Sequence, residues 1–251
     1  MGIKKNMKNY LASLVPKSIK WEINRSSLYL VNPQHQASTF LNLSFSQEGE
    51  DLVLYRLFGN KPTGFYIDIG AHHPFRFSNT CKFHLMGWKG INIDPLPGSM
   101  KLFDEHRPND INLEIAILDK KGDDLKYYVF DEPALNTFDA EAAIRLDTET
   151  HYKIQSKINV EIYRLDEIME KFLPINQVID FISIDVEGLD LSVIKSNNWE
   201  KFRPKYIICE SLSETLEDDF KGEITAFMDT KKYVLNSKTV NSLIFMDLNI
   251  L

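Results

Sequence analysis

Residues 64–74 combine an acid, a glycine and two adjacent histidines, residue types that bind ligands and move protons. An apolar run leads to Asp68, continues to Gly70 and opens onto His72 and His73. Such a run predicts a strand buried on both faces. Because ligands of open α/β sheets bind outside the carboxyl ends of the strands, the segment predicts a binding site at this point.

Acidic residues also follow three later apolar runs, at Asp94, Asp185 and Glu210. Each one alone is explained as a turn residue or a helix cap. The carboxyl ends of parallel strands share one edge of a sheet, so together with Asp68 these acids are expected to line a single crevice.

Gly70 and Asp94 together predict a nucleoside site. A glycine lets the backbone approach a nucleoside, and an acid one βα unit later accepts hydrogen bonds from both ribose hydroxyls. This arrangement serves NAD and S-adenosylmethionine alike. Gly70 is followed by Ala-His-His-Pro, without the further glycines that place helix amides on a pyrophosphate, and the chain has no Tyr-x-x-x-Lys pair. The sequence therefore favours methyl transfer over hydride transfer.

Helix and strand patterns alternate from residue 46 onward, which predicts a doubly wound, mostly parallel α/β sheet. Strands are expected at 65–69, 90–94, 111–118, 125–130, 178–184 and 206–209. Helices are expected at 47–58, 78–86, up to 106, up to 173, up to 197, and at 214–232. The apolar segments 233–235 and 243–246 predict a closing antiparallel hairpin.

The chain is expected to form an N-terminal extension over residues 1–45 and one domain over 46–251. Residues 131–160 are polar and predict a loop plus a helix inserted on the substrate side of that domain.

The net charge is −7, from 29 basic and 36 acidic residues, so nucleic acid is not the expected partner. No apolar run of about 18 residues occurs, which predicts no membrane span. The N-terminus lacks an apolar signal core, so a cytoplasmic location is expected. The two cysteines stand far apart and predict reduced core thiols. The sequence carries no signal for an oligomeric state.

Four motifs resemble the FkbM family of S-adenosylmethionine-dependent methyltransferases, and the similarity covers residues 45–215. The motifs are Ser-Gln-Glu-Gly-Glu-Asp at 46–51, the segment 65–73, Gly-Ile-Asn-Ile-Asp at 90–94, and Ile-Asp-Val-Glu-Gly at 184–188. Residues 76–80 and 134–138 are similar to a bacterial subgroup associated with surface-polysaccharide and capsule gene clusters.

The resemblance implies a class I methyltransferase fold and transfer of a methyl group to a sugar hydroxyl. The acceptor would be a cell-surface saccharide or its nucleotide-sugar precursor. Two alternatives stay open on the residues: an NAD-dependent sugar-nucleotide oxidoreductase, and a non-catalytic scaffold with a degenerate methyltransferase fold.

The resemblance also implies positions for the cofactor. Asp68 and Gly70 would lie at its methionine and ribose side, Asp94 would bind the ribose diol, and Ala116 and Ile117 would border the adenine. The full expected cofactor set is Gln47, Glu48, Asp68, Gly70, Ala71, Ser78, Asn79, Asp94, Ala116, Ile117 and Asp185.

Methyl transfer to an alcohol needs a group that removes the hydroxyl proton. A neutral histidine has a suitable pKa without tuning, so His73 or His72 is the first expectation, with Asp185, Glu187 and Glu210 as further candidates. The competing device is Mg²⁺ or Mn²⁺ held by Asp185, Glu210 and His73. Acceptor recognition is expected from three residues of the insertion, Asn136, Thr137 and Arg145.

Overall fold

The computed structural model describes residues 42–59, 61–119 and 126–250. The chain divides into two units, Met1–Leu43 and Ser44–Leu251, and the second one is described below. The N-terminal extension expected at 1–45 lies almost entirely outside the described residues.

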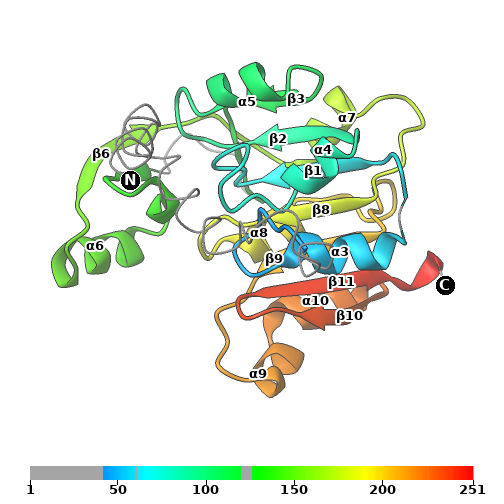
Figure 1. Ribbon diagram of the computed structural model, residues 1–251. Coiled ribbons are helices and arrows are strands. Elements are labelled where there is room, and N and C mark those ends of the chain that lie inside the picture. Colours follow the sequence, from blue (N-terminus) through cyan, green and yellow to red (C-terminus); the bar gives the residue numbers. More distant parts are fainter. Residues whose placement is uncertain (1–41, 60, 120–125, 251) are drawn as a thin grey trace, which may run out of the picture. The chain divides into compact units, whose positions relative to one another are not determined.

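Seven strands form the main sheet, in the order β10-β11-β9-β8-β1-β2-β3 (Figure 1). Their bounds are β1 Phe65–Ile69, β2 Lys89–Ile93, β3 Ile111–Leu113, β8 Phe181–Ile184, β9 Tyr206–Glu210, β10 Tyr233–Lys238 and β11 Ser242–Asp247. Strands β3, β2, β1, β8 and β9 run parallel, whereas β11 is antiparallel to both β9 and β10. The expected mostly parallel sheet with a closing hairpin is confirmed.

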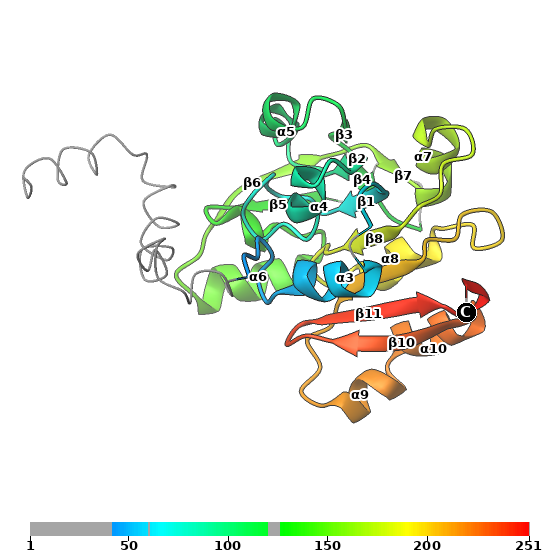
Figure 2. The same cartoon turned by 45° about the vertical axis from the view of Figure 1, so that its right-hand side comes forward.

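Helices cover both faces of this sheet (Figure 2). One face carries α3 (Glu50–Phe58) and α4 (Cys81–Leu85), which bury Leu54 and Phe83 against Phe181 and Ile208. The other carries α7 (Leu165–Phe172), α8 (Asp190–Lys195) and α10 (Glu223–Thr230). Those helices pack on the aliphatic side chains of the central strands, among them Ile67, Ile91, Ile182 and Ile207.

The single strand expected over 111–118 is wrong. The chain leaves the main sheet after β3 and forms β4 (Ala116–Ile117), which pairs instead with β7 (Ile162–Tyr163). The break lies at Glu114, whose carboxylate accepts hydrogen bonds from the N–H groups of Gly98 and Met100, beside α5 (Met100–His106). An apolar run therefore supplies two short strands of different sheets.

The insertion contains more structure than expected. Strand β5 (Lys126–Phe130) pairs antiparallel with β6 (Ile154–Asn159), and α6 (Ala140–Glu149) lies between them in the chain (Figure 2). A short 3-10 turn, η2 (Pro133–Leu135), precedes α6. Strand β6 was not expected because its sequence, Ile-Gln-Ser-Lys-Ile-Asn, is polar and largely exposed, so it lacks the apolar alternation of a half-buried strand.

The helix expected over 214–232 is two helices, α9 (Leu216–Lys221) and α10. Gly222 separates them in an extended conformation with ψ near 154°, which no helix interior accommodates. Across the part of the chain that the structure describes, no helix is long and apolar enough to cross a membrane.

Candidate active site

The loops after β1 and β8 meet where the strand order reverses, the point at which doubly wound sheets bind ligands. Gly70 has φ of 80°, and a Cβ atom there would lie 1.7 Å from the carbonyl oxygen of Asp185. A glycine is thus required at position 70 because the loop after β8 comes so close to it, whether or not a ligand also binds there.

An apolar cavity lies beside the contact between Gly70 and Asp185. Its wall includes both residues expected at the adenine, Ala116 and Ile117. The lining is Ile69, Gly70, Ile93, Pro95, Ile115, Ala116, Ile117, Leu118, Phe138 and Val186.

Asp94 lies between two of the residues that line the apolar cavity and is 7% exposed. Its carboxylate accepts hydrogen bonds from the N–H groups of His72 at 3.0 Å and Leu96 at 2.9 Å. Burial raises the pKa of Asp94, and these two hydrogen bonds oppose the shift. Each carboxylate oxygen keeps further acceptor capacity, so the group is able to bind hydroxyls.

A polar cavity lies on the other side of the contact between Gly70 and Asp185. It brings together five of the residues expected at the site: Gln47, Glu48, Asn79, Asp185 and Glu210. The rest of its lining is Glu50, Phe77, Ile184, Ile208, Asn241 and Ser242.

One wall of the polar cavity is a contact between residues 48–50, at the start of α3, and the tip of the β10–β11 hairpin. Glu48 accepts hydrogen bonds from Asn241 N–H at 2.7 Å and Thr239 Oγ1 at 3.0 Å. Glu50 accepts from Ser242 Oγ at 3.1 Å and Thr239 Oγ1 at 3.2 Å. We call these contacts the clasp. The sequence carried no signal for its hairpin side, because polar turn residues look alike whatever they contact.

Four carboxyl groups gather at the ends of β8 and β9. Burial, followed by the charge of Glu210, raises the pKa of Asp185 and brings that of Glu187 to about 8. The Asp185 residue is exposed to solvent and lines the polar cavity. Burial raises the pKa of Asp190 to about 7, and that of Glu210 also rises. A site that holds carboxylates at this density favours a cationic ligand.

The loop after β1 determines the surroundings of His72 and His73, and through them their protonation. Burial and the Arg76 guanidinium lower the pKa of His72 to about 4, and the pKa of His73 falls for the same reasons. His73 Nδ1 accepts hydrogen bonds from the N–H groups of Phe75 and Arg76, both at 3.1 Å. Both imidazoles are therefore neutral near pH 7, and neither lines the polar or the apolar cavity.

The expected metal set is not brought together. Within the described ranges, no group of three or more His, Cys, Asp or Glu side chains is placed to hold a metal ion. Asp185 and Glu210 share the polar cavity, but His73 does not line it and its Nδ1 is occupied by local amides.

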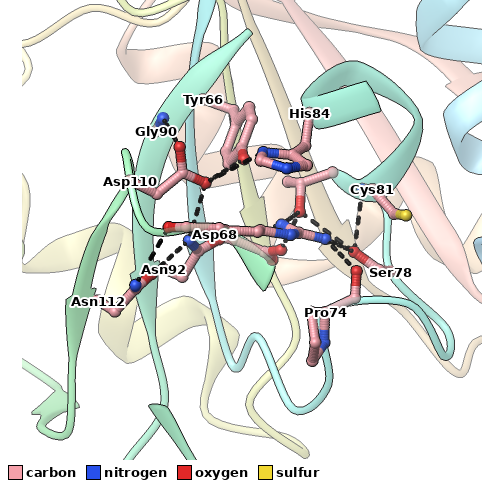
Figure 3. Close-up of polar contacts among 12 residues, drawn as sticks. Tyr66, Asp68, Pro74, Ser78, Cys81, His84, Gly90, Asn92, Asp110 and Asn112 are labelled. Carbon is pink, nitrogen blue, oxygen red and sulfur yellow. Dashed lines mark hydrogen bonds and ion pairs between the residues drawn. The ribbon is translucent and has the colours of Figure 1, made fainter. Parts of the chain in front are cut away.

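Asp68 and Ser78 line neither cavity, and their side chains belong to a network of polar contacts inside the protein (Figure 3). Asp68 is 5% exposed and accepts a 2.5 Å hydrogen bond from Thr80 Oγ1. The Ser78 hydroxyl accepts from Cys81 N–H at 3.1 Å and from the Arg107 guanidinium at 3.0 Å. These contacts give both residues a structural use that the sequence did not distinguish from cofactor binding.

The remaining expected residues lie outside the two cavities. Ala71 packs with Met100 and Phe103 in a small apolar cluster. Asn136 Oδ1 accepts from Phe130 N–H at 2.8 Å. Thr137 is 3% exposed and its hydroxyl donates to the carbonyl oxygen of Glu187 at 3.4 Å, while Arg145 is exposed on α6.

Backbone strain concentrates at this edge of the sheet. Among the described residues, five non-glycine residues have φ in the left-handed region, and three of them, His72, Phe77 and Glu187, stand in the loops after β1 and β8. Such residues persist only where the surroundings hold them, and they cluster at functional sites.

A mostly parallel sheet with a reversed last strand corresponds to the class I methyltransferase fold. The family model of the methyltransferase FkbM domain matches residues 68–235. The match spans more than half of the chain, which therefore belongs to the FkbM family of S-adenosylmethionine-dependent methyltransferases. No match to a curated protein sequence was found.

Solved structures of methyltransferases resemble the chain distantly. The C-terminal domain of precorrin-6Y C5,15-methyltransferase from Rhodobacter capsulatus is 12% identical, with TM-score 0.38 over 78% of this chain and 86% of that one. The enzyme of the same name from Geobacter metallireducens is 10% identical, with TM-score 0.40 over 78% and 88%. A putative RNA methyltransferase from Pyrococcus horikoshii is 10% identical, with TM-score 0.41 over 82% and 91%.

Proposed function

We propose that this protein is an O-methyltransferase that acts on a sugar hydroxyl of a cell-surface saccharide or of its nucleotide-sugar precursor. The observation that carries the proposal is the polar cavity, in which Asp185 and Glu210 lie directly across the chain crossing from the apolar cavity. Carboxylates and side-chain amides, such as those of Glu210 and Asn241, are groups that bind sugar hydroxyls.

The residues present fit S-adenosylmethionine. The apolar cavity, with Ala116 and Ile117, suits the adenine ring, and Asp94 beside it has the acceptor capacity for the ribose diol. The acidic polar cavity suits the cationic sulfur and amino group, and its residues Gln47, Glu48 and Asn79 would surround the methionine portion. We also propose that residues 46–251 act as one methyltransferase domain.

Asp185 is the proposed general base, and burial together with the charge of Glu210 raises its proton affinity. When bound, S-adenosylmethionine supplies a methyl group on a positively charged sulfur. The acceptor hydroxyl would lose its proton to Asp185 Oδ as its oxygen bonds to the methyl carbon, and the electron pair of the broken carbon–sulfur bond would neutralise the positively charged sulfur. Burial, followed by repulsion from Glu210, raises the pKa of Asp185, which makes its ionised form a stronger base. Glu187 lies beside the pair and adds to the same repulsion.

The acceptor is expected to enter on the side of the insertion 131–160. The Thr137 hydroxyl contacts the Glu187 carbonyl, so the insertion is linked to the loop that carries Asp185. Asn136 and Thr137 would act there by holding the insertion in place, and the exposed Arg145 is the one member of the expected set free to reach a charged acceptor group.

The test combines binding with methyl transfer. Isothermal titration should show binding of S-adenosylhomocysteine, and NAD⁺ is the matched control ligand. Transfer of label from methyl-tritiated S-adenosylmethionine to purified surface polysaccharide or to nucleotide sugars should then identify the acceptor, and mild acid hydrolysis should return an O-methyl sugar. Binding of NAD⁺ alone would overturn the proposal in favour of an oxidoreductase, and label found only on nitrogen or carbon would exclude O-methylation.

A further inference from the structure

A buried arginine beside the candidate site belongs to neither cavity. Arg107 follows α5, is 0% exposed, and lies under the loop that connects β1 to α4. The sequence did not single it out, because an arginine after a helix is ordinarily a surface residue.

The Arg107 guanidinium makes four hydrogen bonds inside the protein. Three go to the loop after β1: to the Pro74 carbonyl oxygen, to Ser78 Oγ at 3.0 Å and to Thr80 Oγ1 at 2.8 Å. The fourth goes to Asn92 Oδ1 on β2 at 3.2 Å. Figure 3 shows Pro74 and Ser78 facing this network from the loop, and Asn92 and Asn112 facing it from the strands.

The loop that Arg107 binds is strained and shapes the polar cavity. His72 and Phe77 both have left-handed φ, at 50° and 55°. Phe77 and Asn79 line the cavity, and Asn79 Nδ2 donates to Ser183 Oγ on β8 at 3.0 Å. A backbone of this kind needs contacts that hold it, and the three bonds from Arg107 fall on both sides of Phe77.

We infer that Arg107 is a positioning residue, which holds residues 74–80 in the strained conformation that places Phe77 and Asn79 in the wall of the polar cavity. Asp68 and Thr80 belong to the same hydrogen-bond network, since the Thr80 hydroxyl accepts a hydrogen bond from Arg107 and donates one to Asp68. The inference rests on the proposed function only in taking the polar cavity as the place of the methionine portion of the cofactor.

A lysine at position 107 tests this directly, because it keeps the charge but loses the planar fork that makes four bonds at once. In Arg107→Lys, the Kd for S-adenosylhomocysteine by isothermal titration is expected to rise at least about tenfold, or about 1.4 kcal/mol. Amide hydrogen exchange over residues 72–80 should accelerate, with exchange in β8 and β9 unchanged.

Arg203→Lys is the matched control. Arg203 also makes four hydrogen bonds, to Asp247, Trp199 and Lys231, but it precedes β9 and so lies at the opposite end of the sheet. The Arg203→Lys variant should have a lower melting temperature and an unchanged Kd for S-adenosylhomocysteine. If Arg107→Lys does not fold, Thr80→Val removes one link of the network without changing any charge and should give the same two effects in milder form.

An unchanged Kd in Arg107→Lys, or an equal rise in both lysine variants, overturns the inference, because either result means that Arg107 serves stability alone. The inference is overturned in the same way if Thr80→Val changes neither the Kd nor exchange. None of these measurements uses a methyl acceptor. A wild-type protein that binds S-adenosylhomocysteine but methylates no saccharide would therefore count against the proposed function and leave this inference standing.

Discussion

Gly70 illustrates how one residue serves two needs. The sequence indicated a glycine for close approach to a nucleoside, and the structure shows that the Asp185 carbonyl oxygen already occupies the space of a Cβ atom. The same contact brings the apolar and polar cavities to either side of one crossing.

Gly70→Ala should therefore destabilise the protein by more than conformational strain alone. Gly98 is the matched control, since its φ is 85° against 80° for Gly70, but a Cβ there meets nothing closer than 3.8 Å. We expect Gly98→Ala to lower the free energy of unfolding by about 1 kcal/mol and Gly70→Ala by at least about 3 kcal/mol. Urea unfolding measures both, and equal losses would contradict the steric argument.

Asp185→Asn separates chemistry from binding at the same edge. The amide cannot take the hydroxyl proton, so kcat should fall about 10²–10⁴-fold. The Kd for S-adenosylhomocysteine should change only a few-fold, because that ligand lacks the sulfonium charge. His72→Ala and His73→Ala serve as comparisons, and each is expected to keep most of its kcat. Loss of turnover in a histidine variant with full turnover in Asp185→Asn would return the base to the histidine pair.

Among the helices and strands, the sequence correctly predicted those whose formation does not depend on contacts with distant segments of the chain. Strand β1 and the terminal hairpin follow from apolar runs and turn residues alone. The prediction of one strand over 111–118 was wrong because contacts with neighbouring segments, and not strand propensity, decide where a strand changes partner. Strand β6 was missed because an exposed strand carries no apolar alternation.

The site divides in the same way. Gln47, Glu48, Asn79 and Asp185 were expected through the family resemblance, and all four line the polar cavity. Arg107 and the hairpin side of the clasp were not expected, since their contacts depend on elements distant in sequence.

The clasp should control how long a ligand stays in the polar cavity. Glu48→Ala leaves Asn241 N–H without its acceptor and removes one of the two carboxylates of the clasp, while the Glu50 contacts remain. Loss of hydrogen bonds to a charged group costs about 1.5–3 kcal/mol, so dissociation of S-adenosylhomocysteine should accelerate about tenfold or more. Stopped-flow measurements test this. Glu217→Ala, which removes an exposed pair with Lys221, should leave the rate unchanged, and an equal rate in both variants would show that the clasp does not gate the cavity.

For the whole molecule, the carboxyl cluster sets the pH dependence of stability. The pKa of Glu187 is raised to about 8 and that of Asp190 to about 7, so the folded state binds more protons than the unfolded state above pH 4. The stability from these groups is present below their unfolded pKa values and is lost as pH rises towards 7–8. Asp219 and Asp247, whose pKa values are lowered by Ser211 and Arg203 contacts, lose their contribution on the acid side instead.

The melting temperature without ligand should therefore peak at mildly acidic pH and decline towards pH 8. Differential scanning fluorimetry across this range is the measurement. Glu187→Gln should flatten the decline, because the neutral amide mimics the protonated acid. A decline that is as steep in Glu187→Gln as in the wild type would place its origin outside the cluster.

The reversed final strand also fixes when the site can come into existence. The clasp joins Glu48 to Thr239 and Asn241, which stand 191 and 193 residues further along the chain. Contacts at such separation form late, after the loop between them has been ordered. The apolar cavity is lined by residues no later than Val186, whereas the polar cavity takes Asn241 and Ser242 from the last hairpin. The lining of the polar cavity is therefore complete only when β11 has been made, and a chain interrupted before β11 would also lack Leu243 and Phe245 of the main core.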